Sequence, residues 1–126
     1  FPGFAYSTSG SAGLGQHGSM SKHELRNTGI VRGPSFKSGI TVESPSGNID
    51  IAPTILRILG HDGGESMEGR VLEEALADGS DSVETTSETH TAERNVDSGV
   101  FRQHITVSKV GDTVYVDEGN SEFVPN

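Results

Sequence analysis

His17 is the side chain in this sequence whose type and surroundings are best suited to chemistry. It lies in the segment Gly15-Gln16-His17-Gly18-Ser19. An imidazole nitrogen is a common ligand for zinc, and the flanking glycines carry no side chain that would obstruct the approach of a cation. A single His-Gly pair is more often part of an ordinary surface loop. The segments that follow His17 favour a metal ligand instead.

Three further segments follow the His-Gly pair in a fixed order. They are Gly33-Pro34-Ser35-Phe36-Lys37, Asn48-Ile49-Asp50-Ile51-Ala52-Pro53-Thr54 and Gly69-Arg70-Val71-Leu72. Together with His17, this series resembles the closing metal-ligand segment of the alkaline-phosphatase-superfamily hydrolases. The resemblance is closest to the type I phosphodiesterase and nucleotide pyrophosphatase branch, and it covers about residues 12 to 77.

The resemblance implies a fold, an activity and a role for His17. The fold would be α/β, the C-terminal portion of a three-layer α/β/α alkaline-phosphatase-like fold with a terminal β-hairpin. The activity would be metal-dependent hydrolysis of a small-molecule phosphate ester. In the complete enzyme His17 would complete the ligand set of one of two divalent metal ions, expected to be zinc. Such a pair polarises the phosphoryl group and stabilises the attacking and leaving oxygens.

The other parts of such a site are expected elsewhere, in the remainder of the hydrolase domain. The sequence has no Asp-His-Gly ligand motif and no Thr or Ser that matches the family's nucleophile; Thr8 and Ser9 are interpreted as turn residues. A catalytic zinc ion normally needs three protein ligands. We therefore expect this chain to be a piece of a longer protein and to be inactive alone.

Two alternatives to a phosphodiesterase remain open at this stage. One is a sulfatase or phosphomonoesterase of the same superfamily, which the nucleophile region would distinguish. The other is a non-catalytic acidic interaction domain. Residues 62 to 97 hold 11 acidic residues against only Arg70 and Arg94, and so carry the whole net charge of -9. This stretch could contact a basic partner, or it could simply be a solvated loop.

Composition excludes several classes of function. The 126 residues include no cysteine, so disulfides, thiolate metal sites and a cysteine nucleophile are excluded. An acidic chain with nine basic residues lacks the basic face that nucleic-acid binding requires. No apolar run approaches the ~20 residues of a membrane-spanning helix.

The remaining polar candidates are interpreted as structural or surface residues. Asp50 precedes an apolar segment and is expected to be a helix N-cap. Arg70 is expected to pair with a carboxylate or to bind carbonyl oxygens, with phosphate binding as the weaker alternative. Surface or structural positions are also expected for the other four histidines, His23, His61, His90 and His104.

The pattern of apolar residues predicts the elements that must position these groups. A strand should reach about Val31 and end at Gly33-Pro34. A helix should begin near Asp50 and end at Gly60, and it should be largely buried, because apolar side chains cover most of its circumference. These side chains are Ile51, Ile55, Leu56, Ile58 and Leu59. A short helix is predicted within residues 69 to 76.

The C-terminal part of the chain divides into a loop and a hairpin. Residues 78 to 98 show no apolar periodicity and are predicted to be irregular and mobile. Residues 105 to 108 and 113 to 116 alternate on either side of Gly111-Asp112, as in a β-hairpin. The predicted organisation is therefore 1–77 as the metal-ligand loop and buried helix, 78–98 as an acidic linker or loop, and 99–126 as the hairpin of the same domain.

Overall fold

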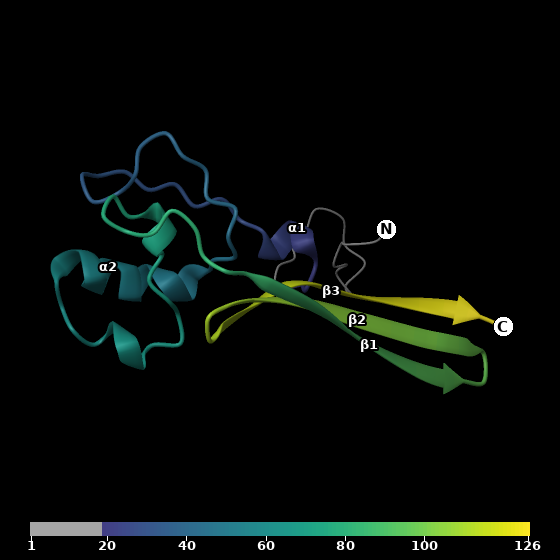
Figure 1. The fold of residues 1–126 in the computed structure, drawn as a ribbon. Coiled ribbons are helices and arrows are strands. Elements are labelled where there is room, and N and C mark those ends of the chain that lie inside the picture. Colours follow the sequence, from purple (N-terminus) through teal and green to yellow (C-terminus); the bar gives the residue numbers. More distant parts are fainter. Residues whose placement is uncertain (1–18) are drawn as a thin grey trace, which may run out of the picture. The chain divides into compact units, whose positions relative to one another are not determined.

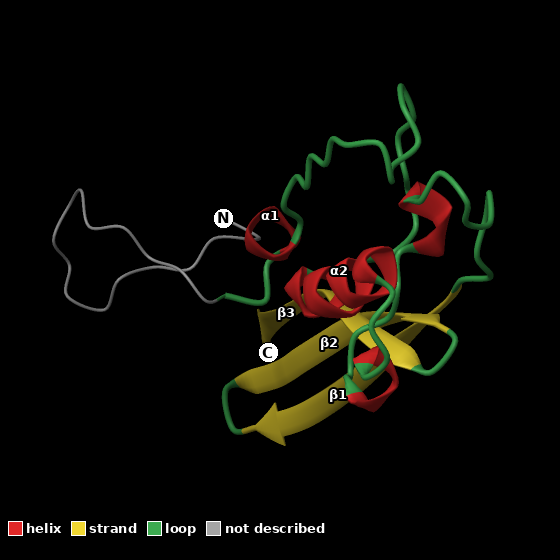
Figure 2. Ribbon diagram, turned by 90° about the vertical axis from the view of Figure 1, so that its left-hand side faces the viewer, coloured by secondary structure: helices red, strands yellow, loops and turns green. Residues whose placement is uncertain are grey.

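The chain has a mixed α/β structure built around a three-stranded antiparallel sheet (Figures 1 and 2). A computed structural model describes residues 19–126. The strands are β1 (Thr86–Val96), β2 (Gly99–Val110) and β3 (Thr113–Pro125), in the order β1-β2-β3. The helices are α1 (Lys22–Leu25) and α2 (Ile51–Leu59), and short 3-10 turns cover Asn48–Asp50, Gly64–Ser66 and Glu73–Ala75.

The residues form two compact units. The described part of the first unit comprises 19–28, 87–107 and 116–126, and it contains α1 and most of the sheet. The second unit comprises 29–86 and 108–115, and it contains α2, the 3-10 turns and the ends of β2 and β3 that flank their connecting turn.

The hairpin predicted around Gly111-Asp112 is confirmed, and its strands extend well beyond the predicted residues. Gly111 has a positive φ of 58°, whereas Asp112 does not have a positive φ. A positive φ at the first central position alone is the pattern of a type II′ turn, which matches the twist of the flanking strands and favours glycine. The turn residues therefore determine where this hairpin closes.

The prediction that residues 78 to 98 are irregular is wrong for most of their length. Thr86–Val96 forms β1, an eleven-residue strand whose residues are all exposed. A strand exposed on both faces has no reason to alternate apolar and polar residues, so the periodicity that normally reveals a strand is absent. Its threonines favour extended backbone, and pairing with β2 supplies the hydrogen bonds.

The predicted helix is confirmed as α2, and Gly60 ends it with a left-handed φ of 67°. Asp50 occupies the predicted N-cap position of α2, but its side chain makes no capping hydrogen bond to the first turn of that helix. A 3-10 turn, Asn48–Asp50, precedes α2, so the helical segment as a whole begins after Gly47. Asp50 is the third residue of that segment, and its carboxylate accepts a hydrogen bond from the Gly47 backbone N–H at 2.8 Å. An acidic residue at this position reaches back to the start of the helix, as in one half of a capping box.

The prediction that α2 is largely buried is wrong, because most of its apolar side chains are partly or largely exposed within this chain. Its buried residues are Pro53 and Thr54, whereas Ile51, Ile55 and Leu59 are about half exposed or more, at 53%, 49% and 63%. These three side chains recur every four residues and therefore form one stripe. Periodicity identified the helix but could not show whether anything covers its apolar face.

Two smaller predictions also fail. No strand ends at Val31, which lies in an irregular segment and is 58% exposed. Within residues 69 to 76, the only helical element is the 3-10 turn Glu73–Ala75. Leu76 instead forms an isolated antiparallel bridge with Phe36, and this non-local pairing replaces the predicted short helix.

Candidate functional site

His17, the predicted metal ligand, lies outside the described residues, as do Thr8 and Ser9. The chain that follows the His-Gly pair is held at three points. The Ser19 N–H donates to Glu24 Oε2 at 2.8 Å, and Ser21 caps α1 by accepting from the His23 N–H. The Met20 carbonyl accepts from the Gly119 N–H of β3 at 2.6 Å. The segment next to His17 is thus anchored to the sheet of the first unit.

Two of the segments that carry the family resemblance contact each other in the second unit. The Arg70 backbone N–H donates to Asp50 Oδ1 at 2.9 Å, and the Leu72 N–H donates to Thr54 Oγ1 at 3.0 Å. Gly69 lies so close to the Ile49 carbonyl that a Cβ atom at this position would overlap it. The backbone of Gly69–Leu72 therefore bonds to side chains of Asn48–Thr54. Because Gly69 has no side chain, the two segments can approach this closely.

The Gly-Pro-x-Phe-Lys segment joins the same unit through Phe36 and Lys37. Phe36 bridges to Leu76, and the Lys37 backbone N–H donates to the Ala75 carbonyl at 2.9 Å. The Lys37 ammonium donates to the Ser80 carbonyl at 2.7 Å and lies 3.0 Å from an Asp81 carboxylate oxygen. All three resembling segments in the described chain are thus parts of one packed unit.

At the centre of that unit lies a buried polar cluster, which we call the Asp50 cluster: Asp50, Arg70, Glu74 and Tyr115. Asp50 is fully buried, and the Tyr115 hydroxyl lies 3.0 Å from both of its carboxylate oxygens. Arg70 binds Glu74 with two nitrogens, Nη2 to Oε1 at 2.6 Å and Nη1 to Oε2 at 2.9 Å. Its Nε donates to the Tyr115 hydroxyl at 3.1 Å. Tyr115 therefore connects the two carboxylates through Arg70.

The pKa values of the cluster follow from burial and from these contacts. Burial opposes ionisation of Glu74, but the hydrogen bonds and positive charge of Arg70 outweigh it and lower the pKa of Glu74. The same pairing raises the pKa of Arg70 despite burial. Burial, reinforced by the hydrogen bond to Asp50, raises the pKa of Tyr115 to about 12. Ionised Glu74 and the neutral phenol of Tyr115 are therefore the favoured forms at neutral pH.

The Asp50 cluster is suited to support rather than to catalysis. Arg70 also donates to the Pro45 and Val71 carbonyls, so its guanidinium is occupied by the protein itself. The prediction that Arg70 pairs with a carboxylate is confirmed, and these contacts disfavour the alternative of phosphate binding. No buried side-chain polar atom within residues 19–126 lacks a hydrogen-bond partner. Such satisfied networks make a core specific and rigid.

Sequence reasoning did not identify Glu74 and Tyr115 as members of this cluster. The signal for Glu74 was present, because it follows Arg70 by four residues, a spacing that permits an ion pair. Tyr115 lies in the alternating segment 113–116, so its inward orientation could be predicted from the sequence. Its partner, 65 residues away along the chain, could not.

The four histidines within residues 19–126 do not assemble a metal site. His23 and His61 are exposed, His90 lies on β1 with its Nδ1 3.6 Å from Glu88 Oε1, and His104 is half-buried on β2. Within residues 19–126 no group of three His, Asp or Glu side chains could hold a metal ion. These positions agree with their interpretation as surface or structural residues.

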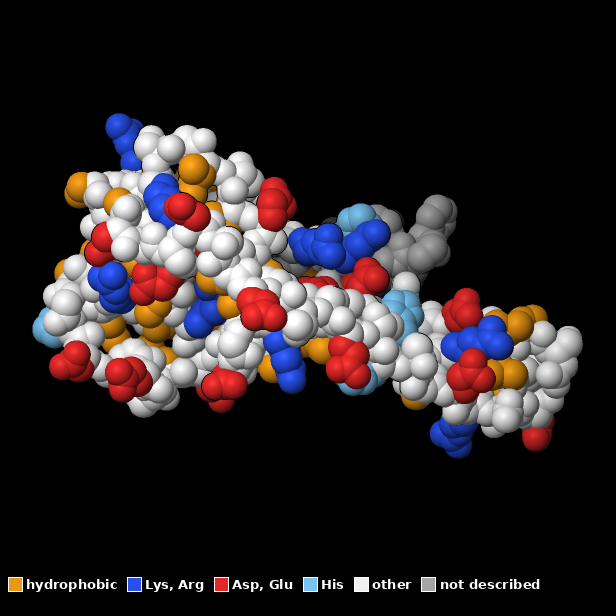
Figure 3. Space-filling model, in the orientation of Figure 1, with side chains coloured by type: hydrophobic (Ala, Val, Ile, Leu, Met, Phe, Trp, Pro, Cys, Tyr) orange, Lys and Arg blue, Asp and Glu red, His pale blue; other side chains and the backbone are white. Residues whose placement is uncertain are grey.

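The acidic stretch is partly neutralised within the chain. Arg57 pairs with Glu73 and Asp78, Lys37 pairs with Asp81, and Arg70 pairs with Glu74. On the face of the molecule shown in Figure 3, acidic and basic side chains are interspersed rather than gathered by sign. This arrangement weakens the interpretation of residues 62 to 97 as one continuous acidic docking surface.

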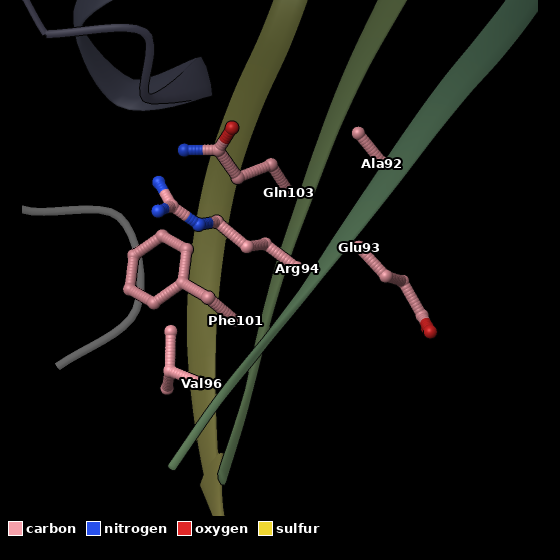
Figure 4. A pocket seen from close by; sticks show the side chains of 6 residues that line it. All are labelled: Ala92, Glu93, Arg94, Val96, Phe101 and Gln103. Carbon is pink, nitrogen blue, oxygen red and sulfur yellow. The ribbon is translucent and has the colours of Figure 1, made fainter. Parts of the chain in front are cut away.

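One open pocket in the first unit has a volume of about 420 Å³ and lies on the β1–β2 hairpin. In Figure 4, the side chains of Arg94, Val96, Phe101 and Gln103 project from the same side of the sheet, and Glu93 projects from the other. The lining combines an aromatic ring, an aliphatic side chain and a guanidinium. It has no pair of groups arranged for acid-base or nucleophilic chemistry.

No helix in the described part of the chain is long and apolar enough to cross a membrane. Comparisons with family models, curated proteins and solved structures found no match to this chain.

Proposed function

We propose that this chain is the C-terminal part of a metal-dependent phosphoric-ester hydrolase of the alkaline-phosphatase superfamily, similar to the type I phosphodiesterases. The observation that supports this most is that the resembling segments within the described residues all belong to one compact unit. Residues 48–54 and 69–72 are joined by hydrogen bonds and a close backbone approach. Residues 33–37 belong to the same unit and are bonded to the segment 75–77 that follows residues 69–72.

The exposed stripe on α2 supports the larger fold as well. Ile51, Ile55 and Leu59 are at least about half exposed, although a helix with such a face normally buries it. We propose that the remainder of the hydrolase domain covers this stripe, so that α2 becomes an internal helix of a three-layer α/β/α fold. Burying each side chain fully would contribute about 1.5 to 3 kcal/mol.

In this proposal His17 supplies one ligand to one of two divalent ions, expected to be zinc. A bound pair of such ions would polarise the phosphoryl group of a small-molecule phosphate ester. This chain's own contribution is the imidazole and the anchoring of the chain that follows it, through Ser19, Met20 and Ser21. The nucleophile and the remaining ligands belong to the rest of the domain.

The test uses the complete gene product that contains this chain. Bound zinc is measured by atomic emission, and hydrolysis is measured with an aryl phosphodiester, an aryl phosphomonoester and an aryl sulfate. We expect His17→Ala to lower bound zinc and to reduce phosphodiester turnover by at least about a hundredfold, the scale of losing a metal ligand or its support. The matched control is His23→Ala on α1, which should leave both unchanged.

Each outcome is informative. Preferential turnover of the sulfate or the monoester would assign the protein to that alternative within the superfamily. A complete product that binds no zinc and hydrolyses none of the three substrates would overturn the proposal. Equal effects of His17→Ala and His23→Ala would overturn the role of His17.

A further inference from the structure

β1 is an edge strand without lysine or proline, and its charged residues are Glu88, Glu93 and Arg94. It has one strand neighbour, β2, and every one of its residues is exposed. Proteins commonly protect such edges with charged residues of one sign, especially lysine, or with proline; the charges of Thr86–Val96 are of both signs, which permits pairing with a strand of matching pattern. Within residues 19–126, no backbone hydrogen bond reaches its outer edge. The edge in Figure 1 is therefore open to another strand.

The pairing of β1 with β2 determines which backbone groups point outward. The strands are joined by the two-residue turn Asp97-Ser98, so Val96 and Gly99 are a hydrogen-bonded pair. Two cross-strand contacts agree with this register: the Thr89 and Thr106 hydroxyls are 3.0 Å apart, and Arg102 Nε donates to Glu93 Oε1 at 2.8 Å. The outward backbone groups are consequently those of alternate residues: Ser87, Thr89, Thr91, Glu93 and Asn95.

The charges of β1 are complementary to those of a second β1. Suppose that the β1 strands of two copies pair antiparallel over their whole length. Thr91, the middle residue of Thr86–Val96, then lies opposite Thr91 of the second copy, and the backbone N–H and C=O groups of these two residues bond to each other. Glu88 lies opposite Arg94 of the second copy, and symmetry repeats this contact. Opposite charges in facing positions stabilise a sheet, and this pair is a non-hydrogen-bonded one, in which side chains lie closest.

Neighbouring registers lack this complementarity. A shift by two residues in one direction places His90 opposite His90 of the second copy. A shift in the other direction places His90 opposite Arg94. Both shifts leave strand ends unpaired. Full overlap and charge complementarity therefore select the same register.

We propose that β1 is a self-association edge, through which two copies of this chain join their sheets in antiparallel orientation. Each copy contributes three strands, so the product is a continuous six-stranded sheet. Glu88, Arg94 and the pocket residues Val96 and Phe101 share one face of the hairpin, so the apolar patches of the two copies extend that face. This proposal does not depend on the hydrolase activity.

Backbone pairing is tested by sedimentation equilibrium of the complete gene product that contains this chain, over a range of concentrations. Proline at position 91 removes an outward N–H while leaving the hydrogen bonds to β2. We expect wild type and the control Thr91→Ala to form dimers and Thr91→Pro to remain monomeric, with all three giving the same circular dichroism. A monomeric wild type at every concentration, or a dimer unaffected by Thr91→Pro, would overturn the proposal.

The register is tested by exchanging charges. Glu88→Arg and Arg94→Glu each replace two attractive contacts by two repulsive ones, and each should raise the dimer dissociation constant about tenfold. The double variant E88R/R94E restores opposite charges and should recover wild-type affinity. Glu84→Arg makes the same charge change just before β1 and should have little effect. Failure of the double variant to recover, or an equal effect of Glu84→Arg, would contradict the β1–β1 register.

Discussion

The Asp50 cluster and the β1–β2 hairpin use the same kinds of side chain in opposite environments. In the cluster, Arg70 and Glu74 form a two-point ion pair whose side chains are only 12% and 2% exposed. On the hairpin, Arg102 and Glu93 form a pair of similar length, but their side chains are 48% and 60% exposed. Water solvates the exposed Arg102–Glu93 pair and can replace either partner when it is removed. Water cannot reach the buried Arg70–Glu74 pair, so removal of one partner leaves the other charge uncompensated.

The difference in exposure indicates that the two regions are stabilised by different kinds of contact. The stability of the second unit depends on a few buried polar groups that must all be satisfied at once, because its buried apolar residues are few. The hairpin depends on backbone pairing, and its side chains remain available for contacts outside the chain. The predictions below test this contrast, beginning with the largest effect.

The largest loss of stability is expected for Asp50→Ala. This substitution removes the acceptor of the Gly47 N–H, the Arg70 N–H and the Tyr115 hydroxyl, and leaves buried donors unpaired. We expect the free energy of unfolding in urea to fall by about 4 to 5 kcal/mol. The control is Asp62→Ala at an exposed position. Equal stability of the two variants would show that the cluster does not support the unit.

A slightly smaller loss is expected for Glu74→Gln, which leaves Arg70 without its counter-charge. We expect about 3 kcal/mol at neutral pH, measured by urea unfolding. Because Arg70 lowers the pKa of Glu74 from its ordinary value near 4.5, ionised Glu74 stabilises the fold above that pH. This contribution is lost as the pH falls through the lowered folded-state pKa.

The acid limb of the pH profile checks that assignment. Wild type should lose stability progressively below about pH 4.5, and Glu74→Gln should show a shallower slope over the same range. Glu65→Gln, at an exposed position, should retain the wild-type slope. An unchanged slope in Glu74→Gln would mean that another carboxylate governs acid unfolding.

An intermediate effect is expected for Tyr115→Phe, which removes only the bridging hydroxyl. We expect a loss of about 1 to 3 kcal/mol, because Asp50 and Arg70 each lose one hydrogen bond in a buried setting. The neutral phenol stabilises the fold at neutral pH, and this contribution is lost as the pH rises from 10.0 through about 12.

Ultraviolet titration separates the two tyrosines of the chain, Tyr6 and Tyr115. The phenolate absorbance of wild type should include a component that titrates near 12, and Tyr115→Phe should remove that component. Persistence of the high-pH component in the variant would assign it to Tyr6 instead.

The smallest effect is expected for Glu93→Gln on the hairpin. Its pair with Arg102 is exposed, so the free energy of unfolding should change by less than about 0.5 kcal/mol. Urea unfolding of this variant beside Glu74→Gln compares the two environments directly. A loss as large as that of Glu74→Gln would remove the contrast between the two regions.

The sequence alone determined the features that depend on neighbouring residues. The Gly111-Asp112 turn, the helix Ile51–Leu59 and its end at Gly60 all follow from local backbone preferences and periodicity, and all are present. The sequence also indicated that Arg70 would bind a carboxylate. The role of His17 rests on the family resemblance and stays a prediction, since that residue lies outside the described chain.

Tertiary structure decided the features that depend on distant residues. It made Thr86–Val96 a strand because β2 supplies its hydrogen bonds, although the segment has no apolar pattern of its own. It placed Tyr115 against Asp50 and left the apolar stripe of α2 exposed. Turn preferences and periodicity act over a few residues, whereas burial and pairing depend on which segments meet in space, and no local pattern contains that information.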